Sequence, residues 1–374
     1  MWNKTSDLLS QDVLRKKYLK PYYHLQTAPS VEFSSKNATA SLHIPLEREH
    51  ARSRKDLILA IREFAVEDRL KSWFFTGSTL LLMMVLFAGT FYGPTVYVRV
   101  ACCIFTPFVF VRMFVIYHDY LHRAILIRSQ LAKVLFWVFG LITLAPFSIW
   151  RRSHDHHHKH NSKLVLGDVG PFQVMTCSQY LAADKTTRFR YLAVRHPLTI
   201  LMAYFTIFLY GMCLQPFMKS PTRHFDCLIA LLLHILLAFL LISAGGWPAF
   251  MLTLFIPLSI SFAFGAYLFY AQHNFPEVLF LSKIEWSYEN AALESSSYLE
   301  MGSFMQWVTG NIGYHHIHHL NCTIPFYRLP EVMARIPELQ KAKKTSLHWR
   351  DVLACLRLKV WDPVKNKMIE LKEL

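Results

Sequence analysis

The sequence predicts an all-α integral membrane protein with four transmembrane helices in two hairpins and a cytoplasmic helical cap that carries a histidine-rich metal site. Three observations predict this fold class. Apolar residues make up 53% and aromatic residues 15% of the 374 residues, which is high for a soluble protein. Four apolar runs are long enough to span a bilayer. Dense groups of histidine occur close to the ends of such runs.

Residues 1–71 form a polar, charged N-terminal region that we expect in the cytoplasm. The first residues, MWNKTSDLLSQDVLRKK, have no apolar core behind their basic residues and no small-residue cleavage site, so they do not resemble a secretory signal. The end of the region, DLILAIREFAVEDRLKSW (56–73), has apolar residues at helical spacing. This pattern predicts an amphipathic helix that leads into the membrane.

Residues 72–360 form the predicted membrane domain, and 361–374 a C-terminal tail. The spans are expected at about 73–92, 95–117, 225–244 and 247–270. The shorter runs 131–149 and 198–217 are expected to lie in the interface or to dip in and return, although the sequence leaves open whether they cross. The connectors after the first and third spans carry little charge, whereas those between residues 150 and 224 are basic. The positive-inside rule therefore assigns the histidine groups and both termini to the cytoplasm.

The net charge of +15 and the seven cysteines exclude other classes of protein and site. Basic residues lie beside apolar runs rather than along one soluble face, which favours anionic lipid headgroups over nucleic acid as their partner. The cysteines include no C-x-x-C pair and several lie in apolar runs. Neither a disulfide framework nor a thiolate metal site is indicated, and a reducing compartment fits best.

Among the nineteen histidines, three dense groups and one single residue are candidate metal ligands. Each group spaces its imidazoles at i, i+3 or i+4, so a helix would present them on one face. The nine candidates are His118 and His122, His154, His157 and His158, His273, and His315, His318 and His319. In these registers His156, His160 and His316 face elsewhere, and His156 and His316 could at most orient a ligand.

The donor set narrows the choice of metal. Nine imidazole nitrogens are too many for one tetrahedral zinc ion but suit two ions with open positions. The groups contain no Cys or Met, which disfavours copper, and the Glu-x-x-His pairs of soluble di-iron bundles are absent. A histidine-rich di-iron centre is the remaining candidate. Asp119 could fix the tautomer of a neighbouring imidazole, or it could instead pair with Arg112 or Arg123.

At these residues the chain resembles the membrane fatty acid desaturase family. The three histidine boxes appear in the family's order as HDYLH, HDHHH and HHIHH, with an additional QH before the third. The segments WRRSHDHHHKHNS and GNIGYHHIHHLNCTIPFYRLPE resemble the bacterial acyl-lipid, omega-6 (delta-12) branch, and the resemblance covers roughly residues 70–360. It implies a four-span fold and a non-haem centre of two Fe ions that uses O2 and two electrons to desaturate an acyl chain.

The resemblance also implies the partners of the reaction, namely a membrane lipid acyl substrate and an external electron donor. The chain has no flavin or nicotinamide fingerprint and no fused cytochrome signature, so a ferredoxin or b-type cytochrome is expected to deliver electrons to the basic face. A bacterial inner membrane is the expected location. A hydroxylase or ketolase of lipids or carotenoids on the same scaffold is a close alternative, and a histidine-rich metal transporter is a remote one.

Overall fold

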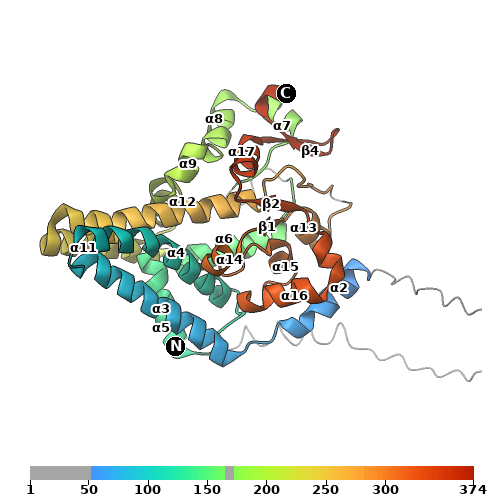
Figure 1. Ribbon diagram of the computed structural model, residues 1–374. Coiled ribbons are helices and arrows are strands. Elements are labelled where there is room, and N and C mark those ends of the chain that lie inside the picture. The colour runs from blue at the N-terminus through green and yellow to red at the C-terminus, as the bar shows by residue number, and fades with distance from the viewer. Residues whose placement is uncertain (1–51, 165–171, 283) are drawn as a thin grey trace, which may run out of the picture. The chain divides into compact units, whose positions relative to one another are not determined.

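The computed structural model describes residues 52–164, 172–282 and 284–374, all of which belong to one compact unit. The expected N-terminal region lies outside the described residues except for its last part. Most of the described chain is helical (Figure 1). The helices include α2 (Arg54–Ile61), η1 (Arg62–Phe64), α3 (Arg69–Tyr92), α4 (Val96–Leu121), α5 (Gln130–Ile142), α6 (Phe147–His160), α7 (Cys177–Ala182), α8 (Lys185–Val194), α9 (Pro197–Leu201), η2 (Tyr204–Leu214), α10 (Gln215–Lys219), α11 (Phe225–Phe250), η3 (Met251–Phe255), α12 (Ile256–Ala271), α13 (Tyr288–Glu294), α14 (Ser303–Val308), α15 (His315–Leu320), η4 (Phe326–Arg328), α16 (Leu329–Arg335), η5 (Pro337–Lys341), α17 (Trp349–Arg357) and η6 (Leu371–Glu373).

The first membrane hairpin consists of α3 and α4. The Asp68 side chain caps the start of α3 by accepting from the Lys71 N–H, and the Thr95 hydroxyl caps α4 by accepting from the Val98 N–H. Gly89 lets the two helices approach closely, because a Cβ at this position would lie 2.5 Å from the Cys102 Sγ. These two helices contain the spans expected at 73–92 and 95–117.

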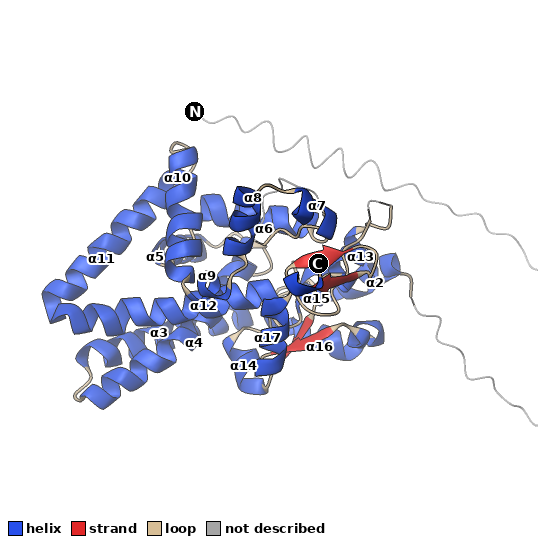
Figure 2. Ribbon diagram, turned by 90° about the horizontal axis from the view of Figure 1, so that it is seen from above, coloured by secondary structure: helices blue, strands red, loops and turns tan. Residues whose placement is uncertain are grey.

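The second hairpin is a helical run from Phe225 to Ala271 that turns at two glycines. Its 47 residues would measure about 70 Å if straight, more than twice the thickness of the hydrocarbon core. Gly245 (φ −148°, ψ 15°) and Gly246 (φ 68°, ψ −170°) leave the helical conformation and divide the run into two legs, each long enough to span (Figure 2). The turn falls at the predicted connector between the third and fourth spans.

The two shorter apolar runs are interrupted. The first forms α5 and α6, which bend by 91° at the break between them. The second, expected at 198–217, is divided into α9, the π-helix η2 and α10. Among the described residues, three helices are long and apolar enough to cross a membrane, or four if the bent pair α5 and α6 is one span.

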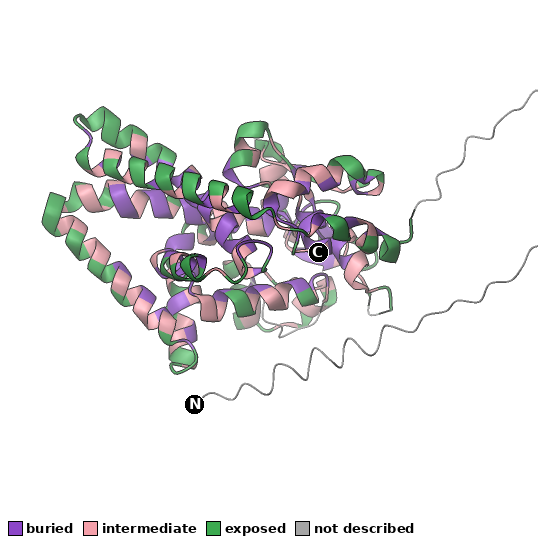
Figure 3. Ribbon diagram, turned by 90° about the horizontal axis from the view of Figure 1, so that it is seen from below, coloured by how far each residue is buried: buried purple, intermediate pink, exposed green. Residues whose placement is uncertain are grey.

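The surfaces of the candidate spans differ in burial. On α11 the residues Leu232, Ile235 and Phe239 are each more than half exposed, and α3 likewise exposes Phe74 and Leu81 (Figure 3). By contrast, α4 is largely buried from Thr106 to Asp119 and contributes many residues to the largest core cluster. Exposed apolar helix faces of this extent are typical of lipid contact, which agrees with an integral membrane protein.

The expectation of an all-α chain needs correction in the C-terminal part. Two pairs of three-residue strands are present: β1 (Tyr298–Glu300) runs parallel to β2 (Lys344–Ser346), and β3 (Val360–Asp362) runs antiparallel to β4 (Lys367–Ile369). These segments are too short for a periodicity to reveal them. The strand β3 buries Trp361 against a cluster that includes Ala271 and Phe275 at the end of α12.

The amphipathic segment before the first span does form a helix, but it contacts protein. Leu57 and Ile61 of α2 are buried with Phe64 against a cluster formed with α15 and α16. Arg328 extends this contact, because its guanidinium lies 5.2 Å from the Phe64 ring centroid. The residues of α2 and η1 therefore pack against α15, the helix that carries the third histidine group, and stabilise its position.

We expect Gly246→Ala to destabilise the second hairpin. Its backbone lies in a region that is essentially restricted to glycine, and occupying it with alanine costs about 1–3 kcal/mol. The matched control is Gly77→Ala in α3, where a Cβ meets nothing within 4 Å and helix propensity predicts a gain of up to about 1 kcal/mol. Thermal unfolding in detergent tests both variants. Equal thermal unfolding midpoints for Gly246→Ala and Gly77→Ala would contradict the assignment of a glycine turn at Gly246.

Candidate metal centre

Four segments of the chain bring the nine candidate histidines together. His118 lies in the last turn of α4 and His122 caps that helix, so the two imidazoles lie one turn apart on one face. The second group lies in α6 and the third in α15, while His273 follows the end of α12. The helical spacing predicted for all three groups is therefore confirmed.

The start of α6 is anchored to the second hairpin. Both the backbone N–H and the hydroxyl of Ser148 donate to the Asp226 carboxylate, at 2.9 and 2.5 Å, and the hydroxyl also lies 2.8 Å from the His224 Nδ1. His224, Asp226 and Cys227 lie within 4.8 Å of one another. Because the Ser148 donors occupy both carboxylate oxygens, Asp226 functions as a cap that orients α6.

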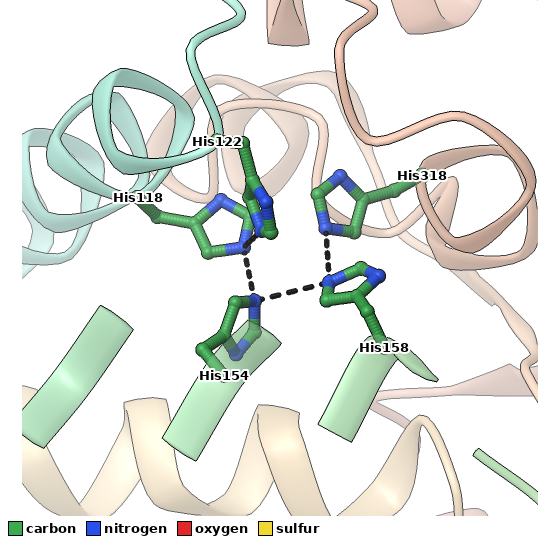
Figure 4. A group of neighbouring side chains, drawn as sticks. All are labelled: His118, His122, His154, His158 and His318. Atoms are coloured by element: carbon green, nitrogen blue, oxygen red, sulfur yellow. Dashed lines mark hydrogen bonds between the residues drawn. The ribbon is translucent and has the colours of Figure 1, made fainter. Parts of the chain in front are cut away.

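The first group of converging nitrogens contains five histidines, and Figure 4 shows their rings pointing toward one another from three helices. Its members are His118, His122, His154, His158 and His318. Their Nε2 atoms form a chain of close contacts. The Nε2–Nε2 distances are 3.2 Å for His122 and His118, 2.8 Å for His118 and His154, 3.1 Å for His154 and His158, and 3.1 Å for His158 and His318. All five residues are buried.

The second group contains the other four candidates, His157, His273, His315 and His319. Their Nε2 atoms form a closed ring in which each contacts two others. The separations around it are 3.0 Å from His157 to His273, 2.9 Å on to His315, 3.1 Å on to His319 and 3.2 Å back to His157. The residues of α6 and α15 are thus shared between the two groups.

These separations suit ligands of a cation better than hydrogen bonds. A neutral imidazole nitrogen either donates or accepts, so a ring in which every Nε2 has two Nε2 neighbours cannot be satisfied by hydrogen bonds alone. Ligands about 2.0–2.1 Å from one ion lie about 2.9 Å apart at right angles and about 3.4 Å apart in a tetrahedron. The observed 2.8–3.2 Å lies on average nearer the right-angle value, which occurs among the ligands of five- and six-coordinate ions.

Burial keeps the histidines beyond the spans in the neutral form that can coordinate a metal. Burial lowers the pKa of His273 to about 4 from its ordinary value of 6.5, against a small opposing effect of the Ser295 carbonyl. Burial also holds the pKa of His315, His318 and His319 well below 6.5. The lone pairs on their Nε2 atoms are therefore available at neutral pH.

Contacts at the opposite ring nitrogen orient two of the candidate histidines. The Asp119 carboxylate lies 3.2 Å from the His118 Nδ1, and its other oxygen accepts from the Phe326 N–H at 2.7 Å. Of the two roles expected for Asp119, orienting an imidazole is therefore the one the geometry supports. The Ser295 carbonyl accepts from the His273 Nδ1 at 2.9 Å. Sequence reasoning missed this acceptor, because a backbone carbonyl carries no residue signature.

The three remaining histidines of the boxes lie outside both groups. His156 and His160 stack with ring centroids 4.0 Å apart, and the His160 Nδ1 lies 2.9 Å from the His156 carbonyl. His316 is fully buried on another side of α15, beside the backbone of Ser297 and Leu339. Trp150, one turn before His154, stacks on that imidazole with its centroid 5.2 Å away; its i, i+4 spacing was the signal that could have identified it.

An apolar cavity of about 120 Å³ reaches both nitrogen groups. Its walls come from α4, η2 and α12 and include Phe114, Phe208 and Phe262. His118 and His154 of the first group line it, and so does His315 of the second. The arrangement can hold a hydrocarbon chain with one part of it next to the imidazoles.

Left-handed residues other than glycine bound the histidine-bearing helices. Arg123 (φ 60°) follows His122, Leu144 (φ 52°) precedes α6, Ser162 (φ 71°) follows α6 and Asn311 (φ 59°) precedes α15. Each such residue costs roughly 1–2 kcal/mol, less for asparagine. The surrounding packing must offset this cost, which is typical of functional sites.

Comparison with known proteins relates the whole site to one family. A family model described as fatty acid desaturase matches residues 94–351, which include all nine candidate histidines. The chain is 30% identical over 273 residues to a fatty acid desaturase from Bacillus subtilis, covering 70% of this chain and 74% of that protein. It is 25% identical over 280 residues to an sn-1 oleoyl-lipid 12-desaturase from Synechocystis (74% and 78%). It is 26% identical over 273 residues to a sphingolipid delta(4)-desaturase from Candida albicans (68% and 67%).

The buried His316 should make the metal-free protein sensitive to acid. Burial lowers its pKa to about 4, so the unfolded chain takes up a proton below about pH 6.5 that the folded chain takes up only near pH 4. The stability from this group is complete above pH 6.5 and falls by up to about 3 kcal/mol toward pH 4. In chelator-treated protein, thermal unfolding should therefore depend less on pH for His316→Asn than for wild type. Parallel pH profiles would contradict this assignment.

Proposed function

Because the chain belongs to the fatty acid desaturase family, we propose that this oxidoreductase introduces a cis double bond into the acyl chain of a membrane lipid at a non-haem di-iron centre. The observation that carries the proposal is the pair of nitrogen groups at one apolar cavity. Five imidazoles would hold one iron, and four would hold the other. Both sets leave open positions on ions that accept up to six ligands.

The protein and the metal have separate roles in this reaction. When bound, the iron pair supplies the oxidising power by which O2, two electrons and two protons convert adjacent CH2 groups into a double bond with release of two water molecules. The protein holds the acyl chain in register with the nitrogen groups. Phe114, Phe208 and Phe262 exclude water from the cavity and offer only apolar contacts to the chain.

The same cavity sets where on the chain the reaction takes place. His118, His154 and His315 line it, so the methylene groups beside these three imidazoles are the ones exposed to both metal sites. Residues farther along α12 and η2 contact the rest of the chain. The relatives named as sn-1 oleoyl-lipid 12-desaturases support a lipid-linked acyl chain as the substrate class.

A membrane orientation and an electron donor complete the proposal. We place the nitrogen groups and both termini on the cytoplasmic side of a bacterial inner membrane, with two hairpins of four spans. Arg151, Arg152 and Lys159 are exposed on α6 next to the nitrogen groups. This basic surface suits an acidic ferredoxin or b-type cytochrome.

The alternative of a metal transporter lacks a supporting observation in the described part of the chain. A transport path needs polar ligands in the middle of the spans. His234 lies within α11, but its Nε2 is hydrogen-bonded to the Tyr204 hydroxyl and belongs to neither nitrogen group.

Replacement of any of the nine proposed ligands by alanine should abolish detectable desaturation and lower bound iron. Asp119→Asn, which weakens the contact that orients His118 without removing a nitrogen, should reduce activity by about 10- to 100-fold. The measurements are iron content and unsaturated product at matched expression. His160→Ala in the same helix as His157 is the control and should keep both. Loss of iron in this control together with activity in His315→Ala would refute the ligand assignment.

A larger side chain at Gly265 should shorten the acyl chain that the enzyme accepts. Gly265 lines the cavity, and a Cβ there would meet nothing within 4 Å, so leucine would project into open space. We expect Gly265→Leu to bind normal iron but to lose about tenfold or more product from long chains relative to short ones. Gly77→Leu on the exposed face of α3 is the matched control. An unchanged product profile would show that the chain does not occupy this cavity.

The proposed topology predicts which side of the membrane each connector faces. In a background without native cysteines, a cysteine at Ser220 should react with an impermeant maleimide only from the cytoplasmic side. A cysteine at Tyr97, which is 83% exposed beside the first hairpin's turn, should react only from the opposite side. If the cysteine at Ser220 reacted only from the outer side, as the one at Tyr97 is expected to do, the segment 198–217 would be a true span and the hairpin assignment would be wrong.

A further inference from the structure

Arg112 is a buried cation whose charge no acidic side chain balances within the described chain. It lies in α4, nine residues before the helix ends, and is only 4% exposed. Its Nε–H donates to the Thr79 hydroxyl at 3.2 Å, and one Nη1–H donates to the Trp307 carbonyl. The ion pairs found among residues 52–164, 172–282 and 284–374 do not include Arg112.

Aromatic rings surround this guanidinium but only partly compensate its burial. The centroids of Trp307, Phe75 and Phe326 lie 4.5, 5.5 and 5.7 Å from its central carbon. A guanidinium has five N–H donors, and the two hydrogen bonds named above use only two of them. A buried charge without an anionic partner is unfavourable. The remaining donors therefore favour an anion from outside the protein.

A cavity of about 490 Å³ lies beside Arg112 and is separate from the one that reaches the histidines. Its polar lining includes Ser303, Gln306 and Asn311 in addition to Arg112. Apart from Met301, the rest of the wall is aromatic, from rings such as Tyr314. A positive charge at the wall of a partly polar, aromatic cavity suits an oxyanion attached to a larger group.

The position of the cavity indicates the source of that anion. Phe75 lies six residues from the start of α3, and Arg112 lies on the neighbouring helix near the end that carries His118. The adjoining helix α14 exposes Phe304 by 57% and Trp307 by 41%. Exposed aromatic residues at the end of a membrane hairpin are typical of the depth at which lipid headgroups lie.

We propose that this cavity binds the phosphate group of a membrane phospholipid, with Arg112 as its charged partner and the aromatic walls around the rest of the headgroup. The guanidinium donates to the phosphate oxygens from one side of α4, while the opposite side of the helix lines the acyl cavity through Phe110 and Phe114. The inference goes beyond the proposed reaction and does not depend on it, because phosphate binding requires neither iron nor turnover.

The test is a thermal-shift titration of the full chain in a neutral maltoside detergent, which contains no phosphate. The probes are dihexanoylphosphatidylglycerol, dihexanoylglycerol and inorganic phosphate. We expect the phospholipid to raise the unfolding midpoint in a saturable manner, while the neutral lipid has no effect and inorganic phosphate needs a much higher concentration. An equal response to inorganic phosphate, or no response to the phospholipid, would overturn the assignment to lipid.

Two variants and a control locate the effect. Arg112→Gln should weaken phospholipid binding by about tenfold or more, since a hydrogen-bonded charge is lost. Gln306→Glu is isosteric and places a carboxylate in the cavity, so it should remove the phospholipid response without loss of stability. Arg99→Gln, at the other end of α4, should respond like wild type. If Arg112→Gln does not fold, the test rests on Gln306→Glu. A wild-type response of Gln306→Glu to the phospholipid would overturn the proposal.

Discussion

The convergence of nine imidazole nitrogens in a buried space is the constraint on which the rest of the structure depends. Nitrogens only about 3 Å from their neighbours must remain neutral, and burial ensures this for those beyond the spans by lowering their pKa. The four contributing segments are far apart in sequence, so their alignment has to come from packing. In α15 the residues Ile317 and Leu320 bury themselves against α2 and α16, while His318 and His319 turn toward the nitrogen groups. The helix α15 thus packs into an apolar core with one side and contributes imidazoles to the nitrogen groups with the other.

The membrane helices supply the other half of this scaffold. The second half of α4 is largely buried, and its core residues Met113, Ile116 and Tyr117 fix the rotation that points His118 and His122 inward. The 91° bend between α5 and α6 brings the second histidine helix across the end of the bundle, where Asp226 holds its first turn. The apolar cavity therefore ends at the imidazoles because the elements that line it also carry them.

Much of the centre could be predicted from the sequence, because metal ligands require particular residue types at particular helical spacings. The i, i+3, i+4 pattern separated His154, His157 and His158 from His156, and it did the same around His316. The pattern could not predict how the ligands divide. His157 joins the second group while His154 and His158 join the first, and this depends on a rotation of α6 that only tertiary packing sets. For the same reason the strands β1 to β4 were not expected, since segments of three residues owe their pairing to distant partners.

The division of ligands has a consequence for biogenesis. Four of the five nitrogens of the first group are already present once the chain has been made as far as His158, but His318 is still missing. The second group has only His157 at that stage and gains three of its four ligands after the last membrane leg is complete. During synthesis at the membrane, neither centre can be completed before α15 emerges and packs against α2, which was made some 250 residues earlier. For the proposed metal centre, loading would therefore be a late event that depends on correct assembly of the whole membrane domain, and a truncated or misinserted chain would lack a complete nitrogen group at either position.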